Sequence, residues 1–326
     1  MHLLVTGASG KLGRRVIARL LRQPLAPNMQ ITALTHSRKL DIADERLIER
    51  RGNIADKSFV DDVMKGITHV VHMATCKEMP ELVMDVTVKG MFWLLEEFRA
   101  QKGKYFILVG GDAAIGHYLY PTNAPITESY PHKAGPGCYS LSKVLEEVML
   151  NQVHIQYGIQ GCCLRAPWLV ADDDLRYALS FSTEVFGSPR WHEYFDCKIS
   201  KQFEKERRVP LPLCAQGKPL QRGILSIDDL VNAIITALKL QPSGCETYNI
   251  SMNEPFDYGL AATHLEAKFG VKSVEVQTQF HSVWMDNKKA LKQLSWQPNF
   301  DTKTLIDSAW AFNSKDNVRT PILYPG

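Results

Sequence analysis

The chain has 326 residues, of which 45% are hydrophobic and 22% charged, and its formal net charge is +3. These values are ordinary for a globular protein, and a charge so close to neutral gives no indication of a nucleic acid or a membrane as partner. The seven cysteines are dispersed, without a CxxC pair or a metal-ligand spacing, so we expect reduced thiols, no bound metal and a soluble cytoplasmic protein.

In the first half of the chain, short apolar runs alternate with amphipathic segments. The pattern predicts strands and helices in alternation, which is typical of a parallel sheet covered on both faces. The predicted strands span 2–6, 31–35, 69–74 and 105–110, and the predicted helices span 12–21, 91–100 and 144–154.

The alternation stops at about residue 170. Residues 172–217 mix aromatic, charged and proline residues without a clear period, and a helix is then predicted over 227–240, a strand over 246–251 and a helix over 259–269. The chain ends in a proline-rich segment. We expect the irregular parts to form a substrate-binding cap. Aromatic residues in the first of them could line a pocket, contact another subunit or form core: Phe181, Phe186, Trp191, Tyr194 and Phe195.

A glycine-rich turn lies between the first predicted strand and the first predicted helix, in the stretch 6–13. Glycines at this spacing allow a tight turn and a close approach to a pyrophosphate, and they direct the helix N-terminus at its negative charge. The predicted dinucleotide-binding residues of this turn are Gly7, Ser9, Gly10, Lys11, Leu12 and Gly13.

The fold predicted from these features is an α/β Rossmann-type, doubly wound parallel sheet with a smaller C-terminal substrate-binding unit. The dinucleotide-binding domain would comprise residues 1–170 together with about 218–245. The cap would comprise residues 171–217 and 246–326.

The end of the second predicted strand bears on which dinucleotide is bound. An acidic residue there would hold the ribose of NAD, whereas an arginine would favour the additional phosphate of NADP. The sequence reads Thr35-His36-Ser37-Arg38-Lys39, and the first acid is Asp41. We therefore expect NADP, or else NAD, as cofactor, with Arg38 at the phosphate; the alternative is that Arg38 is only an exposed loop charge.

Tyr139 and Lys143 stand four residues apart at the start of a predicted helix. Residues at this spacing share a helix face, so the phenol and the ammonium can lie in one cleft. A free tyrosine is a poor base at neutral pH, and a nearby cation lowers its pKa toward the useful range. The pair therefore indicates acid–base chemistry.

With the glycine turn and this pair, the sequence resembles the extended short-chain dehydrogenase/reductase family, specifically its epimerase and dehydratase group. The resemblance extends nearly end to end. Segments 52–56, 72–74, 164–167, 222–229 and 296–298 are similar to further motifs of that family. For these positions the resemblance implies cofactor contacts by Asn53, Ile54, Ala74, Thr75 and Pro167, and a substrate diphosphate contact by Arg222.

The resemblance also implies a mechanism. Tyr139 would move a proton on or off the substrate oxygen as hydride passes to or from the nicotinamide, and Lys143 would hold the ribose and favour the tyrosine anion. A homodimer formed through two helices of the nucleotide domain is typical of the family. Arg222 favours an anionic substrate, although it could instead pair with Asp228 or Asp229.

One position departs from the family pattern. Gly111 stands where the family usually has a serine or threonine whose hydroxyl binds the reacting oxygen. Three explanations remain open: Asp112 takes over the polar role, Thr75 supplies the hydroxyl and contacts substrate, or the protein binds cofactor with little turnover. A second acid, usual in the dehydratases, is absent because the next residue is Ala113.

The predicted function is that of a nicotinamide-dependent oxidoreductase or epimerase. It would act on a hydroxyl or carbonyl carbon of a sugar, sugar acid or sugar nucleotide, with Tyr139, Lys143 and Asp112 as catalytic residues. The alternative, which the missing hydroxyl favours, is a non-catalytic dinucleotide-binding redox sensor.

Overall fold

A seven-stranded parallel sheet forms the centre of the described chain, which in this computed structural model comprises residues 1–184 and 186–312. Its strand order is β11-β6-β5-β4-β1-β2-β3. The strands are β1 (His2–Val5), β2 (Gln30–Thr35), β3 (Leu47–Arg51), β4 (His69–His72), β5 (Tyr105–Gly111), β6 (Gly161–Ala166) and β11 (Cys245–Asn249). Each neighbouring pair runs parallel.

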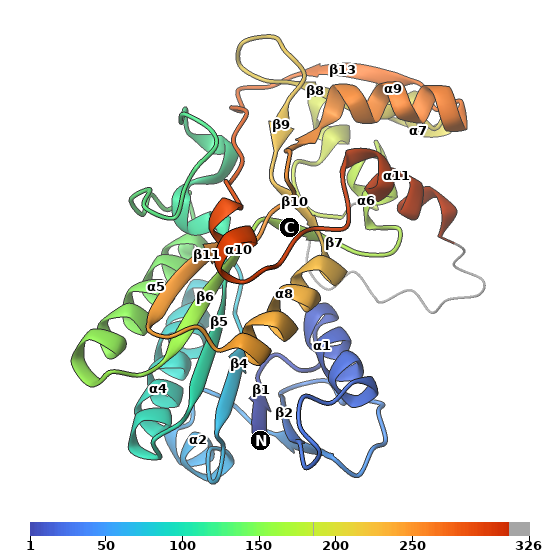
Figure 1. Cartoon of the computed structure of the whole chain (residues 1–326). Helices are drawn as coiled ribbons and strands as arrows, with labels where there is room; N and C mark the ends of the chain where they lie inside the picture. Colours follow the sequence, from blue (N-terminus) through green and yellow to red (C-terminus); the bar gives the residue numbers. More distant parts are fainter. Residues whose placement is uncertain (185, 313–326) are drawn as a thin grey trace.

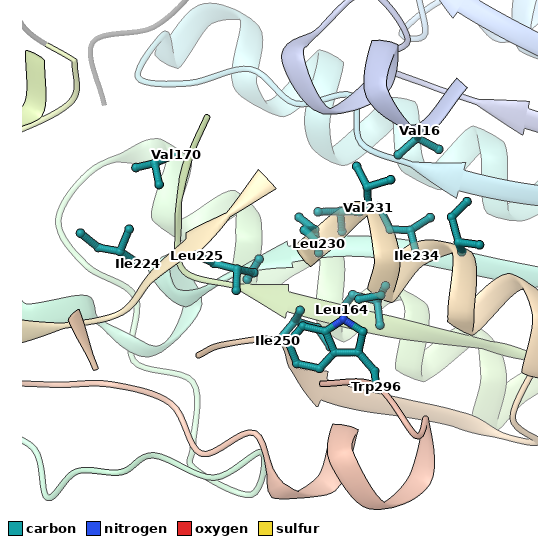
Figure 2. Close-up of a cluster of buried hydrophobic side chains, with 14 of the residues drawn as sticks. Val16, Leu164, Val170, Ile224, Leu225, Leu230, Val231, Ile234, Ile250 and Trp296 are labelled. Carbon is teal, nitrogen blue, oxygen red and sulfur yellow. The ribbon is translucent and has the colours of Figure 1, made fainter. Parts of the chain in front are cut away.

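Helices cover both faces of this sheet because its central strands are apolar on both sides. Leu3 and Val5 of β1 belong to one buried cluster, and Leu4 belongs to another. The first cluster includes residues of α1 (Lys11–Arg22) and α8 (Ile227–Leu240), and Figure 2 shows side chains of both helices together with Leu164 of β6. The second includes residues of α2 (Lys57–Val63), α4 (Gly90–Ala100) and α5 (Cys138–Tyr157).

The strand order reverses between β1 and β4. In open α/β sheets, ligands bind beyond the carboxyl ends of the strands at such a reversal. The predicted Rossmann-type doubly wound fold is therefore confirmed.

Among the described residues, no helix combines the length and the apolar character that crossing a membrane requires.

The smaller unit lies at the carboxyl end of the sheet, in the upper part of Figure 1. Its strands form three pairs: β7 (Trp168–Val170) with β10 (Ile224–Ser226), β9 (Gln221–Arg222) with β12 (Phe256–Asp257), and β8 (Val209–Leu213) with β13 (Ser273–Gln277). Its main helices are α6 (Asp174–Ala178), α7 (Cys197–Lys205), α9 (Tyr258–Phe269) and α11 (Thr302–Ala311). The remaining short elements, which are spread over both units, are α3 (Pro80–Val83), η1 (Met84–Lys89), η2 (Asp112–Ile115), η3 (His117–Leu119), η4 (Trp191–Tyr194) and α10 (Lys288–Gln293).

The sheet extends further along the chain than the boundary drawn from sequence at residue 246. β11 pairs with β6 throughout its length, so residues to Asn249 belong to the sheet and not to the cap. Tyr248 and Asn249 are buried there, and Arg165 of β6 binds the Asn249 side chain at 3.4 Å. The proline-rich end of the chain lies outside the described residues.

The aromatic residues of the first irregular segment are divided between core and surface. Phe181 and Trp191 are almost fully buried and belong to a cluster with Val276, against which Phe195 packs. Tyr194 is exposed. The core interpretation therefore holds for Phe181 and Trp191.

Candidate active site

The glycine turn brings the chain close to the end of β4. Gly7 has φ +65°, and a Cβ there would lie 2.9 Å from the carbonyl carbon of Met73. A Cβ on Gly13 would lie 2.4 Å from the Gly7 oxygen. Gly10 is the N-cap of α1 and brings no side chain to the helix end. The turn thus leaves the N–H groups of α1 free of a side-chain cap, which suits an anion.

The other predicted residues of the turn face different surroundings. The Lys11 ammonium lies 2.6 and 2.7 Å from the two carboxylate oxygens of Asp174 on α6 and 4.6 Å from the centre of the Phe186 ring. The Ser9 carbonyl accepts a hydrogen bond from Arg14 Nε at 3.1 Å, and Leu12 packs against the core. Lys11 therefore joins the turn to the cap.

The predicted adenosine residues follow the outer strands. Arg38 lies in the loop after β2 and is partly exposed. Asn53 follows β3, where its Oδ1 accepts the N–H of Ala55 at 3.0 Å. Ile54 is buried and contacts Gly90, where an added Cβ would lie 2.7 Å from its Cγ2.

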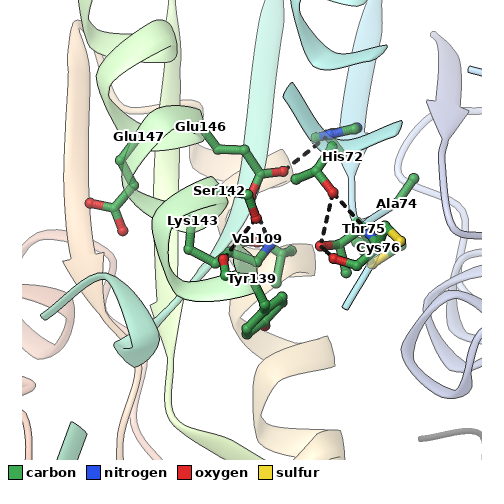
Figure 3. Close-up of polar contacts among 12 residues, drawn as sticks. His72, Ala74, Thr75, Cys76, Val109, Tyr139, Ser142, Lys143, Glu146 and Glu147 are labelled. Atoms are coloured by element: carbon green, nitrogen blue, oxygen red, sulfur yellow. Dashed lines mark hydrogen bonds and ion pairs between the residues drawn. The ribbon is translucent and has the colours of Figure 1, made fainter. Parts of the chain in front are cut away.

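Tyr139 and Lys143 lie near the N-terminal end of α5, beside the end of β5. The Lys143 ammonium lies 5.7 Å from the centre of the Tyr139 ring and 3.4 Å from the Val109 carbonyl oxygen (Figure 3). A Cβ on Gly111 would lie 3.7 Å from the Tyr139 hydroxyl. The structure therefore places Tyr139 and Lys143 next to Gly111, where the family usually has a hydroxyl.

Electrostatics at the pair differ from the simple expectation that Lys143 makes Tyr139 acidic. Burial raises the pKa of Tyr139, Lys143 lowers it, and the net direction is upward. Burial would lower the pKa of Lys143, but Glu146 and Tyr139 outweigh that effect, so the pKa is raised and the side chain is an ammonium.

The loop after β4 holds Ala74 and Thr75. The Ala74 N–H donates to Thr6 Oγ1 at 3.0 Å. Thr75 Oγ1 makes two contacts of 3.5 Å, with the Cys76 carbonyl and with Thr87 Oγ1. Both contacts are at the long limit for a hydrogen bond, so this hydroxyl can be recruited by another group.

A small cavity lies between the sheet edge and the cap. It brings together three predicted residues from distant segments, namely Asp112, Pro167 and Arg222. The remaining lining residues are Ile115, Tyr118, Gly223, Val283, Trp284 and Met285.

Arg222 is the most distinctive group of this cavity. Its guanidinium lies 4.2 Å from the centre of the Tyr118 ring and 4.7 Å from that of Trp168. It is 6% exposed, and its Nη1 is buried without a hydrogen-bond partner among the described residues. A buried polar atom of this kind is rare and requires an explanation such as a bound ligand.

The alternative partners for Arg222 bind elsewhere. Asp228 lies 3.3 Å from Arg15, and Asp229 accepts hydrogen bonds from Asn299. Arg222 is therefore directed at the cavity and not at these two acids.

Several residues at the site were missed by sequence reasoning. Tyr118 and Trp168 carry no motif, because only the fold brings them to Arg222. Lys77, whose ammonium lies 5.5 Å from the centre of the Tyr139 ring, and Glu146, which lies 2.8 Å from Lys143, also escaped notice. The position of Glu146 three residues after Lys143 on a helix was a signal that could have found it.

The geometry agrees with what comparison with known proteins shows. The model of the NAD dependent epimerase/dehydratase family matches residues 3–251. A UDP-glucose 4-epimerase of Yersinia pestis is 22% identical over 352 residues, covering 97% of this chain and 98% of that protein. A dTDP-glucose 4,6-dehydratase of Streptomyces antibioticus is 28% identical over 176 residues, covering 49% and 50% of the two chains. A uronate dehydrogenase of Agrobacterium fabrum is 27% identical over 166 residues, covering 50% and 60%.

Solved structures share the fold over nearly the whole chain. A short-chain dehydrogenase/reductase superfamily protein from Agrobacterium tumefaciens with bound NAD has a TM-score of 0.79 at 20% identity, covering 97% of this chain and 98% of that one. A UDP-glucose 4-epimerase from Thermotoga maritima with UDP-glucose has a TM-score of 0.73 at 18% identity, covering 97% and 99%. The family model covers well over half of the chain, and the fold, the glycine turn and the Tyr139–Lys143 pair accompany it. The chain belongs to the NAD dependent epimerase/dehydratase family.

Proposed function

We propose that this protein is an NAD(P)-dependent oxidoreductase or epimerase that acts on a hydroxyl or carbonyl carbon of an anionic sugar. The observation that carries the proposal is the position of Tyr139 and Lys143 beside Gly111 at the carboxyl end of β5, next to Asp112, which lines the Arg222 cavity. A sugar acid or a sugar nucleotide would supply the anionic group.

The residues at the sheet edge fit a dinucleotide. Gly7 and Gly13 are in such close contact with neighbouring backbone that a side chain would displace the turn, and α1 offers its N-terminal N–H groups to a pyrophosphate. In this proposal Arg38, Asn53 and Ile54 would contact the adenosine half. Ala74, Thr75 and Pro167 would contact the nicotinamide half. Bound there, the nicotinamide would supply the hydride chemistry.

The chain's own residues handle the proton. As a phenol, Tyr139 can donate its proton to a carbonyl oxygen during reduction, and the phenolate accepts it back during oxidation. Lys143 holds its ammonium next to the phenol and stabilises the negative charge that forms on it. Asp112 lines the Arg222 cavity and is the candidate for the polar role that Gly111 cannot fill.

Arg222 would bind the anionic group of the substrate. Tyr118 and Trp168 lie against the guanidinium, and its buried Nη1 has no hydrogen-bond partner among the described residues. The N–H edge of a guanidinium matches two oxygens of a carboxylate or a phosphate. The uronate dehydrogenase and the UDP-glucose 4-epimerase among the relatives bear names that correspond to these two chemistries.

The test follows nicotinamide absorbance with the purified protein, NAD or NADP, and a panel of sugars, sugar acids and sugar nucleotides. Tyr139→Phe should lower turnover at least about 100-fold while cofactor affinity is retained. Tyr157→Phe is the control, because this tyrosine is exposed at the far end of the same helix. Sugar products should be followed as well, since an epimerase returns the hydride to its substrate. Unchanged activity in Tyr139→Phe, or binding of cofactor without turnover of any substrate, would favour the redox sensor.

The same proposal includes a homodimer. Helices α4 and α5 contact each other and lie side by side in Figure 1, and they expose the large apolar side chains Phe92, Leu141, Val148 and Ile155. Apolar side chains gathered on neighbouring helices indicate a protein contact. Light scattering should give a molar mass twice that of one chain. Val148→Asp should reduce the measured mass to that of one chain, because a charge on this surface separates the two subunits.

A further inference from the structure

A buried carboxylate lies directly behind the catalytic lysine. Glu146 occupies α5 three residues after Lys143 and is 0% exposed. Its Oε2 lies 2.8 Å from the Lys143 ammonium, and its Oε1 lies 3.5 Å from Nε2 of His72 on β4. Figure 3 shows Glu146 directed at both groups, whereas Glu147, the next residue, points away from them.

The hydrogen bonds of Thr6 indicate which nitrogen of His72 carries the imidazole proton. Thr6 Oγ1 accepts the N–H groups of Met73 and Ala74, each at 3.0 Å. The hydroxyl proton of Thr6 is therefore free to donate to His72 Nδ1, which lies 2.9 Å away. Neutral His72 then carries its proton on Nε2, the nitrogen that faces Glu146.

These contacts form one continuous polar chain through the interior. It begins at Thr6, next to the glycine turn, continues through His72 and Glu146 and ends at Lys143 beside Tyr139. A buried charge is costly unless it is paired, and an apolar residue would fill the position of Glu146 without that cost. A role in tuning its neighbours accounts for a carboxylate at this position.

We propose that Glu146 is a positioning residue that fixes the Lys143 ammonium and opposes the effect of its charge on Tyr139. This rests on the proposed function only in taking Tyr139 as the proton-handling group. Glu146 would act through Lys143 and would not touch the substrate.

The charges that face Tyr139 support this role. Burial raises the pKa of Tyr139, and Glu146 adds to that effect while Lys143 opposes it. From other elements, Asp112 and Glu78 raise the pKa as well. Lys77 lies over the ring at 5.5 Å, and burial, together with repulsion by Lys143, lowers its own pKa.

The experiment measures the ionisation of Tyr139 directly and needs no substrate. Full-length protein is labelled with tyrosine carrying ¹³C at the phenol carbon, and the Tyr139 signal is identified by its absence in Tyr139→Phe. The midpoint of Tyr139 ionisation is measured in the parent and in each variant. In Glu146→Gln the midpoint should fall by about one pH unit or more, because Lys143 is left without its counter-charge. Glu146→Asp, which keeps the charge, should remain nearer the parent.

Glu147→Gln is the matched control, because it removes a neighbouring buried carboxylate that binds Arg165 and His132. Its Tyr139 midpoint should equal that of the parent. A Glu146→Gln midpoint equal to the parent's would overturn the proposal. Should Glu146→Gln fail to fold, Glu146→Met provides the same loss of charge with an apolar side chain of similar volume. A midpoint that shifts as expected in a protein without turnover would contradict the proposed function alone.

Discussion

The two sides of the candidate active site are built in different ways. On the cofactor side, the glycine turn, Arg38, Asn53 and Ala74 each follow the end of a parallel strand, and the strand order brings these ends to one edge. On the substrate side, the Arg222 cavity is assembled from η2, η3, β9, the residue after β6 and the segment after β13. With this difference, the proposed function assigns the chemistry to the sheet edge and the selectivity to the cap. Substitutions on the first side should change kcat and those on the second should change KM.

The largest expected effect is on stability and concerns the sheet side. Glu147 binds Arg165 of β6 through two hydrogen bonds of 3.0 and 2.6 Å and also binds His132 at 3.0 Å. Glu147→Gln leaves the buried Arg165 without its counter-charge, which should cost about 3–5 kcal/mol of unfolding free energy. Chemical denaturation measures this loss. Glu96→Gln, in an exposed pair with Arg99, should cost less than about 1 kcal/mol.

The same group makes stability depend on acidity. Burial would raise the pKa of Glu147, but His132 and Arg165 outweigh it and lower the pKa. A lowered pKa gives stability that is present above the unfolded value of about 4.3 and lost as pH falls through the folded value. The parent should therefore lose stability below about pH 4, and Glu147→Gln should lose less over that interval. Equal acid sensitivity in the two proteins would contradict this origin.

Asp112 lies between the cofactor side and the substrate side, so its substitution shows to which side it belongs. It directly follows Gly111 and also lines the Arg222 cavity. If Asp112 fills the polar role at the reacting oxygen, Asp112→Ala should lower kcat about 100-fold and leave KM nearly unchanged. Steady-state kinetics with the substrate found in the panel gives both values.

A second variant separates this role from Thr75. Gly111 is in an extended conformation with φ −149°, and a Cβ there meets Tyr139 and Lys143 only at ordinary contact distances. Gly111→Ser in the Asp112→Ala background should therefore recover about tenfold in kcat by restoring a hydroxyl. Full activity of Asp112→Ala, combined with a large loss in Thr75→Ala, would assign the role to Thr75.

The substrate side should respond through binding. Arg222→Lys keeps the positive charge but removes the planar fork and weakens the stacking on Tyr118 and Trp168. We expect KM to rise about 10- to 100-fold with kcat little changed. Arg176→Lys is the control, because this arginine lies over Trp310 away from the cavity. A fall in kcat at constant KM would break the proposed division between the two sides.

Much of the sheet could be predicted because its signals are local. The helix predicted over 227–240 has the observed bounds of α8, and the one predicted over 259–269 is α9 to within one residue. The sequence did not delimit β3, because Leu47–Arg51 is a polar edge strand that alternates only weakly. β11 was predicted as a strand but assigned to the cap, since only its pairing with β6 shows which sheet it joins.

The site divides in the same way. The Tyr139–Lys143 pair could be predicted from sequence because a helix sets the distance between residues four apart. Gly111 could be identified because it stands where the family motif usually has serine or threonine. The contacts of Arg222 with Tyr118 and Trp168 each join residues that lie more than 50 positions apart along the chain. Such contacts depend on tertiary packing, which no local spacing reports.

The smallest expected effect concerns the outer edge of the cofactor side, where Arg38 is the candidate contact to the additional phosphate of NADP. Arg38 follows β2 in a partly exposed loop, so solvent screens its charge more than it screens that of Arg222. Arg38→Ser should weaken NADP about tenfold, since a charged hydrogen bond to the ribose phosphate is lost, and should leave NAD affinity unchanged. Lys39→Ser is the neighbouring control, and fluorescence titration with each dinucleotide measures both affinities. Equal effects on the two dinucleotides would show that Arg38 is only a loop charge, and that the preference is decided elsewhere along the edge of β2.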